Sequence, residues 1–278
     1  FTAGAEAPSN QENNLSSNSE NNDSSGFNTE VSSNPISLAS SNMTRISNET
    51  QYTISIPELL NEPYPIASVS THEYSDEASV EVFSQCPPEV LIIHTHGTES
   101  YSDTAQTNFR TQDKNRNVVA VGTKLADALA EKGIVSIHCE EMFDAESYIK
   151  AYSNSFSAVS EYLEEYPSIK YVIDLHRDAI SDPGGGYAKL LADVNGTSCA
   201  QLMLVVGTDE AGAQHPGWKN NLRTAFEIQE KICEKYPDLM RSVNLRRASF
   251  NQQLSPGYFI LEAGNCGNTI DETMESIQ

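Results

Sequence analysis

The chain is short of basic side chains, and this shortage limits what it binds. Its 278 residues include 17 lysines and arginines against 39 aspartates and glutamates, for a formal net charge of −22. Binding to phosphate backbones needs clustered cations, so we expect no nucleic-acid partner. The same balance argues against electrostatic attachment to anionic lipid.

The chain also lacks paired cysteines and long apolar runs. Its five cysteines show no CxxC spacing, and an odd, scattered set does not make a disulfide framework. No apolar stretch approaches the ~20 residues that a membrane-spanning helix requires. The chain begins FTAGAEAPSN, without methionine. We therefore expect a mature or trimmed form, with any export signal or anchor removed upstream.

Composition divides the chain into three parts. Serine and asparagine fill 22 of the first 50 positions. Such a segment buries too little apolar surface to offset its ordering entropy, so residues 1–50 are predicted to be a disordered tether. Residues 51–88 are predicted to be a linker that ends in two prolines. Residues 89–278 are predicted to be the folded domain.

From about Val90 onward, apolar strand-like runs alternate with helical patterns. NVVAVGTKLADALAEKG has apolar residues three and four apart and a glycine at its end, which indicates a helix. A second long helix is expected to stop at Pro167. The strand-like runs between helices include VLIIHTH, IVSIH, IKYVIDLH, AQLMLVVG and GYFILEAG. This alternation predicts an α/β fold of three layers, αβα, with a mostly parallel central sheet.

Polar side chains that suit chemistry follow three of these predicted strands. In open α/β sheets, ligands bind beyond the carboxyl ends of the strands, so one crevice would collect all three groups. The groups are His94, His96 and Glu99 in VLIIHTHGTE; Asp174, His176, Arg177 and Asp178 in VIDLHRD; and Glu262 in FILEAG.

The histidines and Glu99 predict a zinc site. Catalytic zinc takes three protein ligands, and two histidines with one glutamate are a common set. We predict one Zn²⁺ held by His96, Glu99 and His176. His94 and His96 would share a face of an extended strand, so either imidazole is a possible ligand. His96 is favoured because it is nearer Glu99, which leaves His94 to face substrate or support a ligand.

The alternative is that these histidines end strands and bond only to loop backbone. His138, at the end of SIHCEE, shows that such a position alone is weak evidence.

Glu262 is predicted to be the general base. It would take a proton from the attacking water and return it to the leaving amine, with a pKa raised by partial burial. The alternative is a carboxylate paired with Arg177 or Arg246. Arg177 or His94 would help to hold the oxyanion.

Two further polar side chains receive roles in this prediction. Asp174 is expected to orient a neighbouring imidazole. Asn251 is expected to hydrogen-bond to substrate.

Several blocks in this order resemble the stage II sporulation protein P family. They are HTHGTES, NVVAVG, YPSIKYVIDLHRDA, HPGWKNNL and FNQQLSPGYFILEAGNCGNTIDE. The resemblance implies a membrane-anchored zinc N-acetylmuramoyl-L-alanine amidase that acts on peptidoglycan during forespore engulfment, reported also to cleave stem-peptide crosslinks. It also implies an extracytoplasmic location and two partners, stage II sporulation proteins D and M.

The resemblance also implies site residues. The family's amidase fold is related to that of zinc carboxypeptidases, whose ligands follow the pattern His-x-x-Glu and a later His. His96, Glu99 and His176 are similar to that pattern, and Glu262 corresponds to the late glutamate. Related secreted amidases carry their ligand glutamate at a helix start, where this chain has Asn117, so Glu99 depends on the carboxypeptidase analogy.

Three functions follow from these features. The first is hydrolysis of the amide that joins the lactyl group of N-acetylmuramic acid to L-Ala. The second is a zinc carboxypeptidase or endopeptidase that cleaves peptide bonds. The third is a non-catalytic wall-binding module with structural histidines.

Overall fold

The computed structural model describes residues 45–61, 64–72, 85–104 and 108–278. These residues belong to one compact unit. Among them, no helix combines the length and the apolar character needed to cross a membrane.

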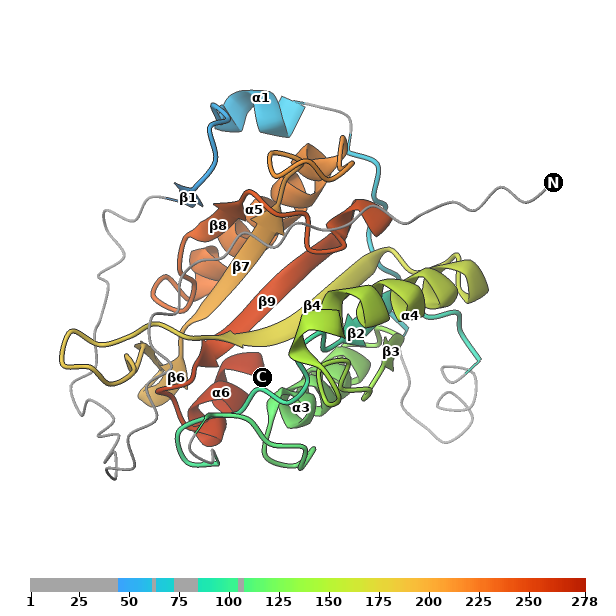
Figure 1. The fold of residues 1–278 in the computed structure, drawn as a ribbon. Coiled ribbons are helices and arrows are strands. Elements are labelled where there is room, and N and C mark those ends of the chain that lie inside the picture. The colour runs from blue at the N-terminus through green and yellow to red at the C-terminus, as the bar shows by residue number, and fades with distance from the viewer. Residues whose placement is uncertain (1–44, 62–63, 73–84, 105–107) are drawn as a thin grey trace. The chain divides into compact units, whose positions relative to one another are not determined.

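The centre of the fold is a seven-stranded sheet (Figure 1). Its strands, in spatial order, are β1 (Ile46–Asn48), β8 (Val243–Arg246), β7 (Leu202–Gly207), β9 (Tyr258–Asn265), β4 (Tyr171–Asp178), β2 (Val90–Ile93) and β3 (Ser136–His138). All neighbours are parallel except β7 and β9, which pair antiparallel. The mostly parallel sheet is therefore confirmed, and the carboxyl ends of β9, β4, β2 and β3 share one edge.

Helices cover both faces of this sheet. They are α1 (Ile56–Asn61), α3 (Val118–Glu131), α4 (Ala151–Glu165), α5 (Trp218–Lys235) and α6 (Ile270–Ile277), with short 3₁₀ turns η2 (Tyr148–Lys150) and η3 (Gln252–Leu254). One core cluster joins Val121 of α3 and Leu222 of α5 to Leu175 of β4. Another joins Val159 of α4 to Val172 of β4. The side chain of Val172 points to the opposite face of the sheet from that of Leu175. The three-layer αβα prediction is confirmed.

Several elements were not predicted from the sequence. They are the hairpin strand β6 (Thr197–Ala200), which pairs with β5 (Leu191–Val194), the strand β8 and the helix α6. Strands of three or four residues are too short to show a period. Helix α6 had a readable signal, since Thr269 and Glu272 form a capping box at its start.

Strand β1 and helix α1 lie in the segments predicted as tether and linker. β1 pairs in parallel with β8, and Val243 N donates to Arg45 O at 2.9 Å. Leu59 of α1 is buried in the core. The described residues of these segments therefore add an edge strand and a helix to the fold, while the domain limits themselves stay predictions.

A buried amide connects α5 to the segment that leads into β9. Asn221 Nδ2 donates to the carbonyls of Gln252, Ser255 and Tyr258 at 3.2, 2.7 and 2.9 Å. We expect Asn221→Ala to lower the free energy of unfolding by ~1–3 kcal/mol, because buried carbonyls would lose their donor. Denaturant unfolding measures this loss. Asn220→Ala, at the partly exposed neighbouring position, is the matched control and should change stability far less.

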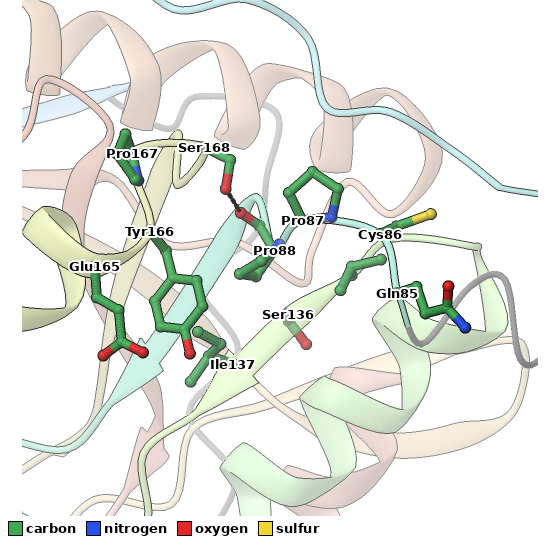
Figure 2. A pocket seen from close by; sticks show the side chains of 11 residues that line it. Gln85, Cys86, Pro87, Pro88, Ser136, Ile137, Glu165, Tyr166, Pro167 and Ser168 are labelled. Carbon is green, nitrogen blue, oxygen red and sulfur yellow. Dashed lines mark hydrogen bonds between the residues drawn. The ribbon is translucent and has the colours of Figure 1, made fainter.

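A groove lies at the amino ends of the strands, away from the predicted site. It has a volume of about 670 Å³ and is lined by residues before β2 (Pro87, Pro88), in β3 (Ser136, Ile137) and between α4 and β4 (Tyr166 to Ser168). Figure 2 shows these side chains and the hydrogen bond from Ser168 Oγ to the carbonyl of Pro88, 2.6 Å long. None of the predicted site residues lines this groove.

Candidate active site

Strand register brings His176 and Glu262 together. β4 and β9 are parallel neighbours, and His176 pairs directly with Glu262. Cross-strand neighbours point to the same face, so both side chains lie on the α4 face of the sheet, at its carboxyl edge. This pairing follows from the strand order, which the sequence did not supply.

The turn after β2 brings His96 and Glu99 to the same place. The strand ends at Ile93, and Glu99 N donates to His96 O at 3.1 Å within a turn. The rings of His96 and His176 lie edge to face, with centroids 5.4 Å apart. Glu99 Oε2 lies 3.5 Å from His176 Nδ1. Two imidazoles and one carboxylate are thus buried neighbours, and we call this cluster of side chains, with Glu262, the crevice.

Several nitrogen and oxygen atoms that could bind a metal are buried in this crevice without a hydrogen bond. Among the described residues, His96 Nδ1, His176 Nε2 and Glu262 Oε2 have no such partner. No three of the described His, Cys, Asp or Glu side chains already form a metal-binding group. The residue types fit zinc, and the unpartnered atoms are ones that a bound cation would satisfy.

Arg177 fixes Glu99. Arg177 N donates to Glu99 Oε2 at 3.1 Å, and the guanidinium contacts Glu99 Oε1 at 3.4 Å. Burial alone would raise the pKa of Glu99, but Arg177 and His176 hold it well below its usual range. The other guanidinium nitrogens donate to the carbonyls of Ser100 and Phe109, both at 3.1 Å. All three guanidinium nitrogens therefore contact Glu99 or the loop carbonyls. This favours a role in positioning Glu99 over the predicted contact with an oxyanion.

Asp174 lies beside His176, where an orienting role was predicted. It accepts from Thr95 N and Thr95 Oγ1 at 2.8 and 2.6 Å. Its Oδ1 is 2.9 Å from His176 Nε2, a close ionic contact although its direction is not that of a hydrogen bond. Burial would lower the pKa of His176, but Asp174 and Glu99 raise it well above its usual value. The imidazole thus lies between two carboxylates.

Glu262 is a carboxyl group that forms no ion pair with another described residue. The residue is partly exposed, but its Oε2 is buried. This burial is the main cause that raises the pKa of Glu262 to about 8. The alternative pairing fails, because Arg177 bonds to Glu99 and Arg246 Nε lies 3.0 Å from Glu49. Its buried surroundings and raised pKa are typical of a group that transfers protons.

This pKa predicts how the metal-free protein responds to pH. A folded-state pKa of about 8, above the usual 4.5, means that the fold binds a proton that the unfolded chain has released. The stabilisation is present below the unfolded pKa and is lost as pH rises through about 8, with a slope of up to ~1.4 kcal/mol per pH unit. After chelation, unfolding curves from pH 5 to 9 should show this slope in the wild type. Glu262→Gln should show a shallower slope, because the raised pKa of His176 still contributes in both proteins, and equal slopes would contradict the assignment.

His94 does not face the crevice. β2 ends at Ile93, so the chain has left the extended conformation before His96, and the two histidines do not share a face as predicted. His94 Nδ1 contacts Leu175 O at 3.1 Å, and Nε2 lies 2.8 Å from His138 Nε2. A Cβ on Gly122 of α3 would lie 2.5 Å from His94 Nε2, so the ring points to the α3 face. The substrate-facing role and the oxyanion role are therefore corrected to a packing role.

The side chain of Asn251 also forms hydrogen bonds within the fold. Its Nδ2 donates to Tyr152 O at 2.7 Å and to Ser155 Oγ at 3.1 Å, both on α4. Its backbone has φ 60°, a left-handed conformation that asparagine tolerates better than most residues. The predicted substrate contact is corrected to a link between the loop before β9 and α4.

Several residues of the crevice were missed by the sequence analysis. Asp144 Oδ2 lies 3.7 Å from His96 Nδ1 and accepts from Thr98 Oγ1 and Arg110 Nη1, both at 2.6 Å. Tyr148 stacks on His96. They lie in loops and a short turn, where no periodicity marks a residue, so only the tertiary fold reveals them.

Asn117 begins helix α3 next to Glu99. Its side chain caps α3 by accepting from Val119 N at 3.0 Å, and it donates to Thr111 O at 3.0 Å. Val118 N donates to Glu99 O at 2.9 Å, so Glu99 lies beside the helix start.

Comparison with known proteins gives a family match. The model of the family described as stage II sporulation protein P (SpoIIP) matches residues 3–278. The stage II sporulation protein P of Bacillus subtilis (strain 168) is 26% identical over 197 residues, covering 66% of this chain and 47% of the relative. The chain thus spans about half the length of this curated relative.

Two solved structures are also similar. An N-acetylmuramoyl-L-alanine amidase from Clostridium difficile 630 shares 16% identity at a TM-score of 0.38, over 69% of this chain and 88% of that chain. The catalytic domain of the CD27L endolysin, which targets Clostridia difficile, shares 16% identity at a TM-score of 0.40, over 68% and 94%.

Proposed function

Because the chain belongs to the stage II sporulation protein P family, we propose that it is a zinc-dependent peptidoglycan hydrolase. The reaction is hydrolysis of the amide between the lactyl group of N-acetylmuramic acid and L-Ala. The observation that carries this proposal is the juxtaposition of His96, His176 and Glu262, from three separate segments, at the carboxyl edge of the sheet. A buried crevice with two imidazoles and carboxylates of different pKa suits metal-assisted hydrolysis.

In this proposal His96, Glu99 and His176 hold the zinc ion. Bound zinc would lower the pKa of a water molecule to about 7 and polarise the substrate carbonyl. Glu99 remains ionised because Arg177 lies beside it. Asp174 Oδ1 lies 2.9 Å from His176 Nε2, so its negative charge would favour a cation on this side of the ring.

Glu262 moves the proton. Its Oε2 is buried on the same face as His176 and has no hydrogen-bond partner among the described residues, and burial outweighs the influence of His176 and Arg177 on its pKa. It would accept the proton of the attacking water and deliver it to the leaving nitrogen of L-Ala. Burial raises the pKa of Glu262, so that it transfers the proton both ways near neutral pH.

Zinc analysis followed by product identification tests the proposal. Purified protein should contain about one zinc per chain, and chelation should abolish digestion of sacculi until zinc is restored. Mass analysis of the products should show glycan strands free of peptide. Intact sugar–peptide links with cleaved crosslinks would instead indicate the peptidase alternative, and a zinc-free protein that binds walls without cleaving them would indicate the non-catalytic one.

Partners and location follow the family in this proposal. The substrate is peptidoglycan, and the expected protein partners are stage II sporulation proteins D and M. The expected site of action is the engulfment membrane around the forespore, outside the cytoplasm.

A further inference from the structure

Two large apolar side chains are exposed beside the crevice. Tyr148 is 58% exposed and Ile149 is 74% exposed, and both belong to η2, which leads into α4. The Tyr148 ring stacks on the His96 ring, with centroids 4.2 Å apart and planes 14° apart. Exposed apolar groups that continue directly from a buried site are typical of a substrate surface. We call Tyr148 and Ile149 the ledge.

Arg110 helps to hold the ledge in place. Its guanidinium carbon lies 4.6 Å from the centre of the Tyr148 ring, while its Nη1 donates to Asp144 at 2.6 Å. The ring therefore rests against two groups of the crevice, yet more than half of the residue remains exposed. Its free surface is fixed in position and available to a ligand.

The charges around the ledge favour an uncharged ligand. The segment from residue 140 to residue 150 holds four acids (Glu140, Glu141, Asp144, Glu146) and one base, Lys150. Two of the acids are paired, Glu140 with Lys114 at 3.1 Å and Asp144 with Arg110. Among the described residues, Glu141 and Glu146 form no such pair. Without those pairs, two acids remain against Lys150, so the surface around the ledge is weakly acidic and disfavours an anionic ligand.

We propose that the ledge binds the sugar next to the scissile amide. This inference rests on the proposed function, in which that amide has a neutral glycan on one side and a stem peptide with free carboxylates on the other. The acidic surroundings disfavour the peptide, whereas the ring of Tyr148 can pack against the apolar face of a sugar ring, and Ile149 against its acetamido methyl. The ledge makes the enzyme prefer substrates that carry the sugar.

A pair of substrates tests the ledge. One is a disaccharide–peptide with the muramic acid ring, and the other is a D-lactoyl-peptide with the same amide but no sugar. We expect the wild type to favour the first in kcat/KM, and Tyr148→Ala to reduce that preference five- to tenfold, about the contribution of one aromatic contact. Tyr148→Phe should keep the preference, because the contact needs the ring and not the hydroxyl. Rates are expressed per bound zinc, since Tyr148 touches His96.

Binding of a peptide-free glycan oligomer separates this inference from the proposed function. The oligomer should bind wild-type protein and bind Tyr148→Ala at least fivefold more weakly, about the loss of one aromatic contact. If Tyr148→Ala weakens oligomer binding but neither protein hydrolyses the amide, the sugar-binding role of the ledge is supported and the amidase proposal is refuted. If the amide is cleaved but Tyr148→Ala slows both substrates equally and binds the oligomer normally, the ledge is refuted. Leu60→Ala, at an exposed apolar residue of α1, is the matched control and should keep the wild-type preference.

Discussion

His176→Ala is expected to lose zinc and hydrolytic activity together. The imidazole lies between Asp174 and Glu99, 2.9 and 3.5 Å away, and it would supply one of three zinc ligands. Loss of a residue that merely supports a ligand costs ~10–100-fold in metal affinity, so loss of the ligand itself should cost more. Metal analysis after dialysis against a weak chelator, with digestion of sacculi, measures both effects.

The structure offers a matched histidine control for this variant. His138 touches His94 on the α3 face and lies outside the crevice. His138→Ala should therefore keep about one zinc per chain and its activity. Circular dichroism of both variants separates metal loss from unfolding, because His176 is buried and its removal leaves two carboxylates without their cation. Full zinc occupancy in folded His176→Ala would refute the ligand assignment.

The sequence predicted the scaffold well because its periodic signals are strong. The helix from residue 118 to residue 131 and the long strands β4 and β9 lie where apolar spacing placed them. The antiparallel pairing of β7 with β9 was not predictable, since both strands are buried apolar runs that carry no mark of direction. β1 was missed because a three-residue edge strand depends on its partner β8 and not on its own pattern.

The site residues also divide into those that the sequence predicted and those that it did not. Residues at strand ends, such as His176 and Glu262, could be named because a parallel sheet directs them to one edge. The directions in which side chains point within turns could not be predicted. The wrong prediction for His94 arose because the predicted strand extended three residues beyond the end of β2. Asp144 and Arg110 act on the crevice through contacts between loops far apart in sequence, which only the tertiary fold creates.

Glu262→Gln is expected to keep zinc and lose ~10²–10⁴-fold in turnover, the usual contribution of general acid–base catalysis. The amide has nearly the shape of the carboxyl group and sits opposite His176 in the same register, but it cannot accept a proton from water. Since the change acts on the chemical step, kcat should fall while KM stays close to its wild-type value. Glu141→Gln, at an exposed acid outside the proposed ligand set, is the control for the loss of one negative charge and should digest sacculi normally. If zinc-loaded Glu262→Gln digests them at the wild-type rate, the proton is carried by another group, and the raised pKa of Glu262 reflects burial alone.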